Sequence, residues 1–234
     1  MKPIARAVIF DLDGTLVDSL EDLADCTNTA LAAFSLPTHP LAPYKYFVGM
    51  GVKNLIGSAV PAGTPDDLVK DVTTFYRAEY AQHWARKSRP YEGIIPMLEH
   101  LAAMDIPLAV LSNKAQIFTG DFVAHFFPGT SFLTVQGSPA EGVAKPDPAM
   151  ALAIAAQMGL SSNEIAFMGD TRTDMETANN AGMLPVGVTW GFRPESELVE
   201  FGATVLLHHP DELFTKVVLK PAAHTDKGDC AILE

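Results

Sequence analysis

Residues 7–15 read AVIFDLDGT, an apolar run of four residues followed at once by two aspartates on either side of a leucine. A run this short and this apolar predicts a strand buried on both faces of a parallel sheet. Because side chains alternate along an extended chain, Asp11 and Asp13 are expected to point to the same side just beyond the strand. Open parallel sheets bind ligands at the carboxyl ends of their strands, so this stretch also predicts where the site lies.

Similar apolar runs recur at 107–111, 165–168, 185–189 and 204–207. Helical patterns lie between them, at 95–104, from Asp147-Pro148 to Met158 with a stop at Gly159, and at 174–181 with a stop at Gly182. Asp caps helices, Pro fits their first turn, and Gly ends them in the left-handed conformation. Strands that alternate with helices predict an α/β fold, with a Rossmann-like doubly wound parallel sheet covered on both faces.

The segment 19–87 breaks this alternation, because it contains no convincing buried strand. Its apolar residues follow two helical faces, which comprise Leu20, Leu23, Thr27, Ala30, Leu31 and Phe34 in the first and Leu68, Val72, Phe75 and Tyr76 in the second. We therefore expect a small helical domain at 19–87, inserted into a discontinuous core of residues 1–18 and 88–220. Residues 221–234 have little apolar periodicity and are expected to form a flexible tail.

The composition of the 234 residues is that of a globular protein, with 48% hydrophobic and 19% charged residues. The net charge of −12 argues against nucleic acid and against a polybasic membrane contact, because both need a basic face. No apolar run approaches the length of a membrane span and no signal peptide is evident, which predicts a cytoplasmic protein. The two cysteines, Cys26 and Cys230, lie far apart in the sequence and are interpreted as reduced thiols.

Polar residues also follow the other predicted strands, at the same edge of the sheet. Ser112 and Asn113 come after one strand, Asp170 comes after another, and Lys145 opens the loop before a helix. Asp174 lies four residues beyond Asp170, so these two carboxylates are expected to share a helix face. The loops thus gather acids, a hydroxyl, an amide and a positive charge, which are the groups that phosphoryl transfer needs.

Two carboxylates held close together suit a division of roles. One aspartate can stay ionised and act as the nucleophile, while the other carries the proton of the leaving group. Asp11, Asp170 and Asp174 form an oxygen cluster without histidine or cysteine, a composition that favours Mg²⁺ over zinc. Ser112, Asn113 and the main-chain amides of the first loop are the expected contacts of phosphate oxygens. An isolated pair of aspartates would be weak evidence, but the four loops together predict a functional site.

The four loops resemble the four motifs of the haloacid dehalogenase-like hydrolases. The matching stretches are Asp11-Leu12-Asp13-Gly14-Thr15-Leu16-Val17-Asp18-Ser19, Ser112-Asn113-Lys114, Lys145-Pro146 and Gly169-Asp170-Thr171-Arg172-Thr173-Asp174. The resemblance extends from Val8 to about Leu213. Within the superfamily the chain is similar to the phosphoglycolate phosphatases, in the stretches Val48-Gly49-Met50-Gly51-Val52, Pro90-Tyr91-Glu92-Gly93, Ser112-Asn113-Lys114 and Thr189-Trp190-Gly191-Phe192-Arg193.

The resemblance implies a role for each matching residue. Asp11 would form an aspartyl-phosphate, Asp13 would protonate the leaving alcohol and then activate water, and Lys145 would steady the phosphoryl group and Asp11. The implied substrate contacts are Thr15, Ser112, Asn113, Gly49 and Gly51. The implied Mg²⁺ ligands are Asp11, the main-chain carbonyl of Asp13, Asp170 and Asp174, the last either as a ligand or in the outer sphere.

The segment 19–87 resembles the helical cap of the superfamily, which implies a domain that closes over the site, excludes water and selects the substrate. The loop 47–52 is its expected specificity element, since its glycines permit a close approach of the backbone to a small ligand. Lys45, Lys53 and Arg77 are cations of this segment that could pair with a substrate carboxylate, although a solvated surface role is favoured for each.

We therefore expect a Mg²⁺-dependent phosphatase that hydrolyses a small phosphorylated metabolite, with 2-phosphoglycolate as the candidate substrate, as a monomer or homodimer. Three alternatives stay open. A sugar phosphomutase would return the phosphoryl group to a sugar, and a phosphonate hydrolase would need an imine-forming lysine, for which Lys53 is the nearest candidate. A non-catalytic phosphate-binding protein is disfavoured, because every expected catalytic position carries a competent residue.

Overall fold

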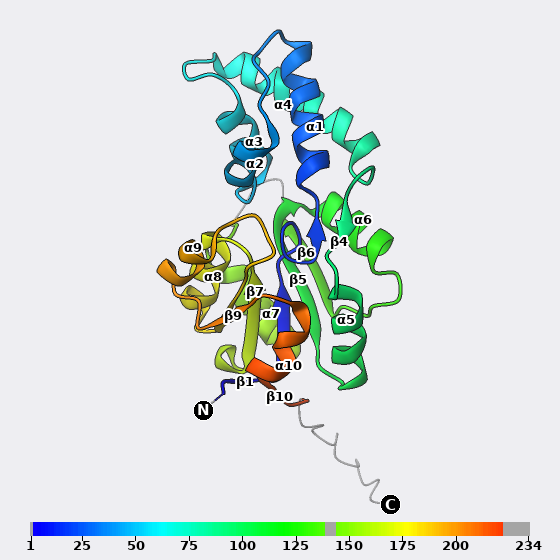
Figure 1. Ribbon diagram of the computed structural model, residues 1–234, viewed down its shortest axis with the longest axis vertical. Helices are drawn as coiled ribbons and strands as arrows, with labels where there is room; N and C mark the ends of the chain where they lie inside the picture. Colours follow the sequence, from blue (N-terminus) through cyan, green and yellow to red (C-terminus); the bar gives the residue numbers. More distant parts are fainter. Residues whose placement is uncertain (1, 139–143, 222–234) are drawn as a thin grey trace, which may run out of the picture.

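The computed structural model describes residues 2–138 and 144–221 (Figure 1). Within these residues, six strands form a parallel sheet in the order β6-β5-β2-β7-β8-β9. The strands are β2 (Ala7–Phe10), β5 (Leu108–Ala115), β6 (Thr134–Ser138), β7 (Ile165–Gly169), β8 (Leu184–Val188) and β9 (Val205–Leu207). The earliest of them, β2, lies between β5 and β7, as in a doubly wound sheet. The predicted α/β fold is therefore confirmed.

Alternate side chains of the sheet face two separate cores. In β2, Val8 and Phe10 belong to one core, and Ala7 and Ile9 belong to the other. The helices that cover the first face are α5 (Ile94–Ala103), α6 (Gln116–Phe126) and α10 (Leu213–Lys216). Those on the second face are α7 (Ala149–Met158) and α8 (Arg172–Ala181), and α9 (Glu195–Glu200) packs beside α8. Both faces of the sheet are buried, which is why its inner strands are continuous apolar runs in the sequence.

All five apolar runs are strands of this sheet, but β6 was not predicted. It carries a glutamine, a glycine and a serine, and it lies at the edge of the sheet, where β5 is its partner. An edge strand is only partly buried, so its sequence need not be apolar. The short parallel pair β1 (Ile4–Ala5) and β10 (Val218–Leu219) was not predicted either.

Four of the five helices between β2 and β5 lie beyond the carboxyl end of the sheet (Figure 1). We call them the helical insert: α1 (Leu20–Ala33), α2 (Leu41–Phe47), α3 (Gly51–Ala59) and α4 (Asp66–His83). The chain enters and leaves the insert through an antiparallel ribbon of β3 (Val17–Asp18) and β4 (Arg89–Pro90). None of the described helices combines the length and the hydropathy needed to span a bilayer.

Most of the expected apolar faces of the insert are buried. The buried residues of α1 include Leu20, Leu23, Thr27, Ala30 and Leu31, and those of α4 are Val72, Tyr76 and Tyr80. Phe75 differs from the prediction, because it is 39% exposed and meets Phe34 edge to face. Cys26 is a buried free thiol. The expected flexible tail, apart from residue 221, and Cys230 lie outside the described residues.

The predicted helix ends are confirmed, whereas the starts differ. Gly159 and Gly182 end their helices in the left-handed conformation, with φ of 64° and 68°. Helix α7 begins after Pro148, and Asp147 accepts a hydrogen bond from the Ala149 N–H at 2.9 Å. Helix α8 begins two residues earlier than predicted, and an extended Thr171 precedes it. Asp170 therefore lies before the helix, so the prediction that it shares a helix face with Asp174 was wrong.

Candidate active site

The loops at the carboxyl edge of the sheet meet around the ammonium group of Lys145. Its Nζ lies 2.7 Å from Oδ1 of Asp11 and 2.6 Å from Oδ1 of Asp174. Asp11 directly follows β2, and its N–H donates to the carbonyl of Met168 in β7, so neighbouring strands fix its position. All three charged side chains are buried, at 3% exposure for Lys145, 9% for Asp11 and 1% for Asp174.

Separate donors orient the two acids that follow β7. Asp170 accepts hydrogen bonds from Oγ1 of Thr15 at 3.2 Å and from the N–H of Phe192 at 2.8 Å. Asp174 accepts from both the N–H and the Oγ1 of Thr171, at 3.0 and 2.7 Å, in the capping box that begins α8. The carboxylates converge despite the changed helix start, because the cap turns Asp174 back towards the strand end.

Among the described residues, Asp11, Asp170 and Asp174 each offer an oxygen within 4.8 Å of the others, and all three are buried. With all three carboxylates ionised, the single ammonium of Lys145 leaves two negative charges in a buried site. One divalent cation would balance them, and an all-oxygen donor set suits Mg²⁺. The residues present therefore fit a magnesium ion.

Burial changes the protonation of this cluster. It raises the pKa of Asp11 to about 7, against the opposing influence of Lys145 and with a smaller contribution from Asp174. Burial, with Asp174 and Asp11, also raises the pKa of Asp170 well above its ordinary value. Burial alone would lower the pKa of Lys145, but the two carboxylates beside it outweigh burial and raise it. A cation in the cluster would favour the ionised form of each acid.

Glycines leave the room that Asp170 occupies. A Cβ atom on Gly14 would lie 2.3 Å from its Oδ2, and one on Gly191 would lie 2.3 Å from its Cβ. Gly14 also has a φ of 88°, a conformation that L side chains rarely adopt. These two glycines therefore allow loops from opposite ends of the sequence to close around one carboxylate.

Asp13 faces a different cation. Its two carboxylate oxygens lie 2.9 and 3.0 Å from Nζ of Lys114, and Oδ1 also accepts a hydrogen bond from Oγ of Ser19 at 2.6 Å. Strand β2 ends at Phe10, so the alternation expected for an extended chain does not continue through Asp13. Asp11 and Asp13 thus have separate charged partners, and Asp13 is outside the three-acid cluster.

The other predicted substrate contacts differ in their surroundings. Oγ of Ser112 lies 3.2 Å from the N–H of Lys114 that donates to it. Nδ2 of Asn113 donates to the carbonyls of Gly49 and Lys145, while its Oδ1 accepts from the N–H of Lys145. The Asn113 side chain therefore joins three segments. Ser112 and Asn113 lie within β5, which continues to Ala115, so the prediction that they follow the strand was wrong. A phosphoryl contact by either residue stays a prediction.

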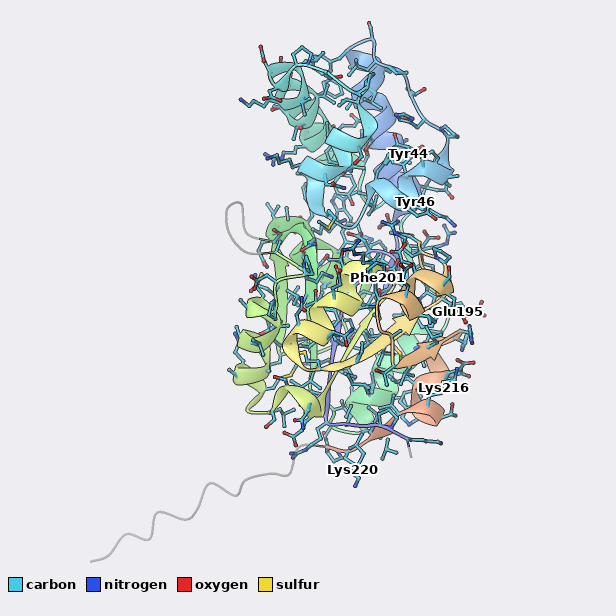
Figure 2. All side chains as sticks on the ribbon, turned by 90° about the vertical axis from the view of Figure 1, so that its left-hand side faces the viewer. Tyr44, Tyr46, Glu195, Phe201, Lys216 and Lys220 are labelled. Atoms are coloured by element: carbon cyan, nitrogen blue, oxygen red, sulfur yellow. The ribbon has the colours of Figure 1, made fainter. Side chains whose placement is uncertain are left out.

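The predicted glycine loop of the insert packs against the core. Gly49 has a φ of 115°, and a Cβ on Gly51 would lie 3.4 Å from the carbonyl oxygen of Asn113. The ring of Tyr46 stacks 4.6 Å from the guanidinium of Arg193, which also donates to the carbonyl of Val48 at 3.3 Å. Figure 2 shows Tyr46 at the end of the insert that faces the core. These contacts seat the insert over the carboxyl edge of the sheet.

The cations expected to reach a substrate carboxylate have no buried setting. Lys45, Lys53 and Arg77 are all exposed. Lys114, near the end of β5, was quoted within the stretch Ser112-Asn113-Lys114 but was given no role in the site. The rule that polar residues at a strand end belong to the site already pointed to it. Tyr80, by contrast, reaches this cation only through the packing of α4 against α6, for which the sequence has no signal.

Comparisons with known proteins found similar sequences and a similar structure. A family model described as haloacid dehalogenase-like hydrolase matches residues 8–188. A phosphoglycolate phosphatase of Mannheimia succiniciproducens is 32% identical, over 89% of this chain and 93% of its own. An N-acetylmuramic acid 6-phosphate phosphatase of Pseudomonas aeruginosa is 28% identical, over 89% and 92%. The crystal structure of a predicted phosphoglycolate phosphatase from Haemophilus somnus 129PT has a TM-score of 0.85 at 27% identity, over 90% of this chain and 97% of that one.

Proposed function

The chain belongs to the haloacid dehalogenase-like hydrolases and is a phosphoric monoester hydrolase, and from this premise we propose a Mg²⁺-dependent phosphatase that works through an aspartyl-phosphate on Asp11. The proposed substrate is a small phosphomonoester of a hydroxy acid, with 2-phosphoglycolate as the candidate. Two relatives, a phosphoglycolate phosphatase and an N-acetylmuramic acid 6-phosphate phosphatase, are both named for phosphorylated carboxylic acids. The observation that carries the proposal is the buried ammonium of Lys145 between Asp11 and Asp174, beside Asp170.

Asp11 is the proposed nucleophile because its carboxylate is fixed at the end of β2. Lys145 holds that carboxylate and stabilises negative charge on the transferring phosphoryl group. Asp11, Asp170 and Asp174, with the main-chain carbonyl of Asp13, would hold Mg²⁺, which supplies charge stabilisation to the phosphoryl oxygens when bound. Ser112 and Thr15 are the other proposed contacts of the phosphoryl group.

Asp13 is the proposed acid and base. In the first step Asp11 bonds to phosphorus while the ester bond breaks, and Asp13 gives its proton to the departing alkoxide. In the second step Asp13 takes a proton from the water that attacks phosphorus, which releases phosphate and regenerates Asp11. Lys114 and Ser19 orient the Asp13 carboxyl for this exchange.

We propose that the helical insert is a cap, with residues 19–87 as its extent and residues 1–18 and 88–220 as the catalytic core. Its seat over the strand ends would exclude water from the phosphoenzyme, and its opening would admit the substrate. A phosphonate hydrolase with Lys53 gains no support, because an imine-forming lysine works in a desolvated setting and Lys53 is exposed.

The test is phosphate release from 2-phosphoglycolate with Mg²⁺ present. Asp11→Asn is expected to lose at least about 10³-fold in kcat, as removal of a nucleophile does in other enzymes. Asp121→Asn, an exposed acid on α6, is the matched control and should retain wild-type turnover. An Asp11→Asn variant with wild-type turnover would contradict the proposal, as would a wild-type protein that isomerises a sugar phosphate without releasing phosphate.

A further inference from the structure

Resting on the proposed function, we propose that Lys114 and Tyr80 together bind a carboxylate of the leaving group and so determine the preference for phosphorylated acids. Lys114 comes from β5 of the core, and Tyr80 comes from α4 of the insert. The two residues meet at the seam between core and insert, where Nζ of Lys114 lies 5.0 Å from the centre of the Tyr80 ring.

Lys114 is a buried cation that can donate a further hydrogen bond. Its side chain is 6% exposed, and its Nζ also lies 4.1 Å from the centre of the Phe122 ring. Both of its close oxygens belong to the Asp13 carboxylate. An ammonium group has three N–H donors, so one can bond to another acceptor while the others hold Asp13.

Tyr80 supplies a hydroxyl that the described residues leave unused. The residue is 2% exposed, and its Oη has no hydrogen-bond partner within the described part of the chain. A buried hydroxyl without a partner is unfavourable, so such groups are rare outside functional sites. Neighbouring rings fix Tyr80, because Tyr76 stacks on it at 5.5 Å and Phe118 meets its edge at 5.1 Å. The hydroxyl is therefore carried by a fixed ring whose centre lies 5.0 Å from Nζ of Lys114.

The position of this pair fits the leaving side of the reaction. The proposed acid, Asp13, must reach the leaving oxygen, and its partner Lys114 therefore lies close to whatever that oxygen carries. In 2-phosphoglycolate a single CH₂ group separates the leaving oxygen from the carboxylate. That carboxylate would approach Asp13 as well, and repulsion would exclude it without a cation. Lys145 is already shared between Asp11 and Asp174, which leaves Lys114 for this role.

Arg193 is the competing candidate, because its Nη1 is also buried without a partner in the described chain. Its guanidinium, however, already joins the insert to the core through the Tyr46 ring, the Val48 carbonyl and Glu197. Glu197 accepts from Nε, which balances the charge of Arg193 locally. Among the described residues, Lys114 forms an ion pair only with Asp13, the proposed acid and base.

The experiment compares two substrates that differ only in the group at issue. Ethyl phosphate has a methyl group where 2-phosphoglycolate has its carboxylate. Wild type is expected to prefer the acid in kcat/KM. Lys114→Met should lower kcat/KM for 2-phosphoglycolate by about 10- to 100-fold more than for ethyl phosphate, and Tyr80→Phe by about 5- to 10-fold more, mainly through KM. Lys70→Met, at an exposed position of α4, is the matched control and should change both substrates equally.

Several outcomes would overturn the assignment. Equal losses on both substrates would mean that Lys114 acts only through Asp13. An acid-selective loss in Arg193→Met instead would move the carboxylate site to that residue. A wild-type protein that releases phosphate from other esters but shows no preference for the acid would refute the carboxylate site and leave the phosphatase intact. A different result would refute the proposed phosphatase mechanism, namely wild-type turnover by Asp11→Asn. Tyr80→Phe keeps the ring, so its result does not depend on tolerance of a larger change.

Discussion

Asp170 illustrates how closely a single residue of the site is enclosed. The nearest atoms to a Cβ on Gly191 would be the Cβ of Asp170, at 2.3 Å, and the carbonyl oxygen of Gly14, at 2.4 Å. Neither is the far end of a flexible side chain, so neither can move aside cheaply. The glycine is thus required by space rather than by backbone conformation.

Gly191→Ala is therefore expected to displace Asp170, to lower the free energy of unfolding by about 1–3 kcal/mol and to weaken Mg²⁺ binding by about tenfold or more. Calorimetric titration with Mg²⁺ and thermal melts measure both effects. Gly57→Ala in α3 is the control, because a Cβ there meets nothing within 4 Å. It should keep Mg²⁺ affinity and gain up to about 1 kcal/mol of stability from helix propensity. Unchanged Mg²⁺ affinity in Gly191→Ala would remove Asp170 from the ligand set.

The Asp11 carboxyl makes the stability of the metal-free protein depend on pH. Its pKa in the folded protein is raised to about 7, chiefly by burial, whereas the same group in an unfolded chain titrates near about 4. Between these values the folded protein binds more protons than the unfolded chain. The free energy of unfolding contributed by this group therefore falls as pH rises through that window.

Mg²⁺ competes with this proton, so the rise in Tm on adding Mg²⁺ should be larger at about pH 7.5 than at about pH 5. Melting curves with and without Mg²⁺ at the two pH values measure the difference. Asp11→Asn lacks the titrating group and should show a smaller dependence on pH. If Mg²⁺ stabilised wild type equally at both values, the cluster would not be the metal site.

At the scale of elements, Asp22 joins the two ends of the helical insert. It is 2% exposed in the first turn of α1, and its carboxylate accepts from the N–H groups of Lys87 and Ser88 and from Oγ of Ser88. These residues lie just before β4, where the chain returns to the core. The carboxylate therefore fixes the spacing of the two strands through which the insert is attached.

Asp22→Ala would leave main-chain donors buried without an acceptor, and we expect the free energy of unfolding to fall by about 2–4 kcal/mol. Asp25→Ala, on the same helix, removes an exposed acid that pairs with Nζ of Lys87 and should change stability little. Chemical denaturation of both variants tests this. A loss in Asp22→Ala no larger than in Asp25→Ala would show that the ribbon keeps its spacing without the carboxylate.

The elements that the sequence could predict are those whose burial has a simple period. The strands covered on both faces are plain apolar runs, and α1 has an apolar helical face. The edge strand β6 was missed because half-burial leaves no such pattern. The start of α8 was misplaced because a threonine cap with an acid at the third position sets it, and Asp174 was interpreted only as a ligand.

The same limit applies to the site. Residues placed at strand ends, such as Asp11 and Asp170, were predictable because topology alone brings strand ends together. The use of the Asn113 side chain to join Gly49 to the Lys145 loop was not predictable, since it depends on where the insert rests. The position of Tyr80 beside the core could not be predicted from the sequence for the same reason. Contacts between core and insert are set by packing over long sequence separations, which local patterns do not record.

At the scale of the whole molecule, the net charge of −12 acquires a local meaning. With their carboxylates ionised, the described acids Asp11, Asp13, Asp170 and Asp174 outnumber the neighbouring cations Lys145 and Lys114, so that form of the site is negative before a metal binds. A phosphate dianion would be repelled from such a site. Addition of Mg²⁺ balances the remaining charge and turns the same residues into an anion site.

Inorganic phosphate is therefore expected to bind at least about tenfold more weakly when a chelator removes Mg²⁺, because the metal reverses the local field as well as assisting the chemistry. Isothermal titration of wild type with phosphate, with Mg²⁺ and then with chelator, measures the ratio. Asp170→Asn should bind phosphate weakly even with Mg²⁺, whereas Asp121→Asn on the exposed side of α6 should match wild type. Equal phosphate affinity with and without Mg²⁺ would mean that Lys145 and Lys114 alone overcome the acids, and the link between net charge and metal dependence would be lost.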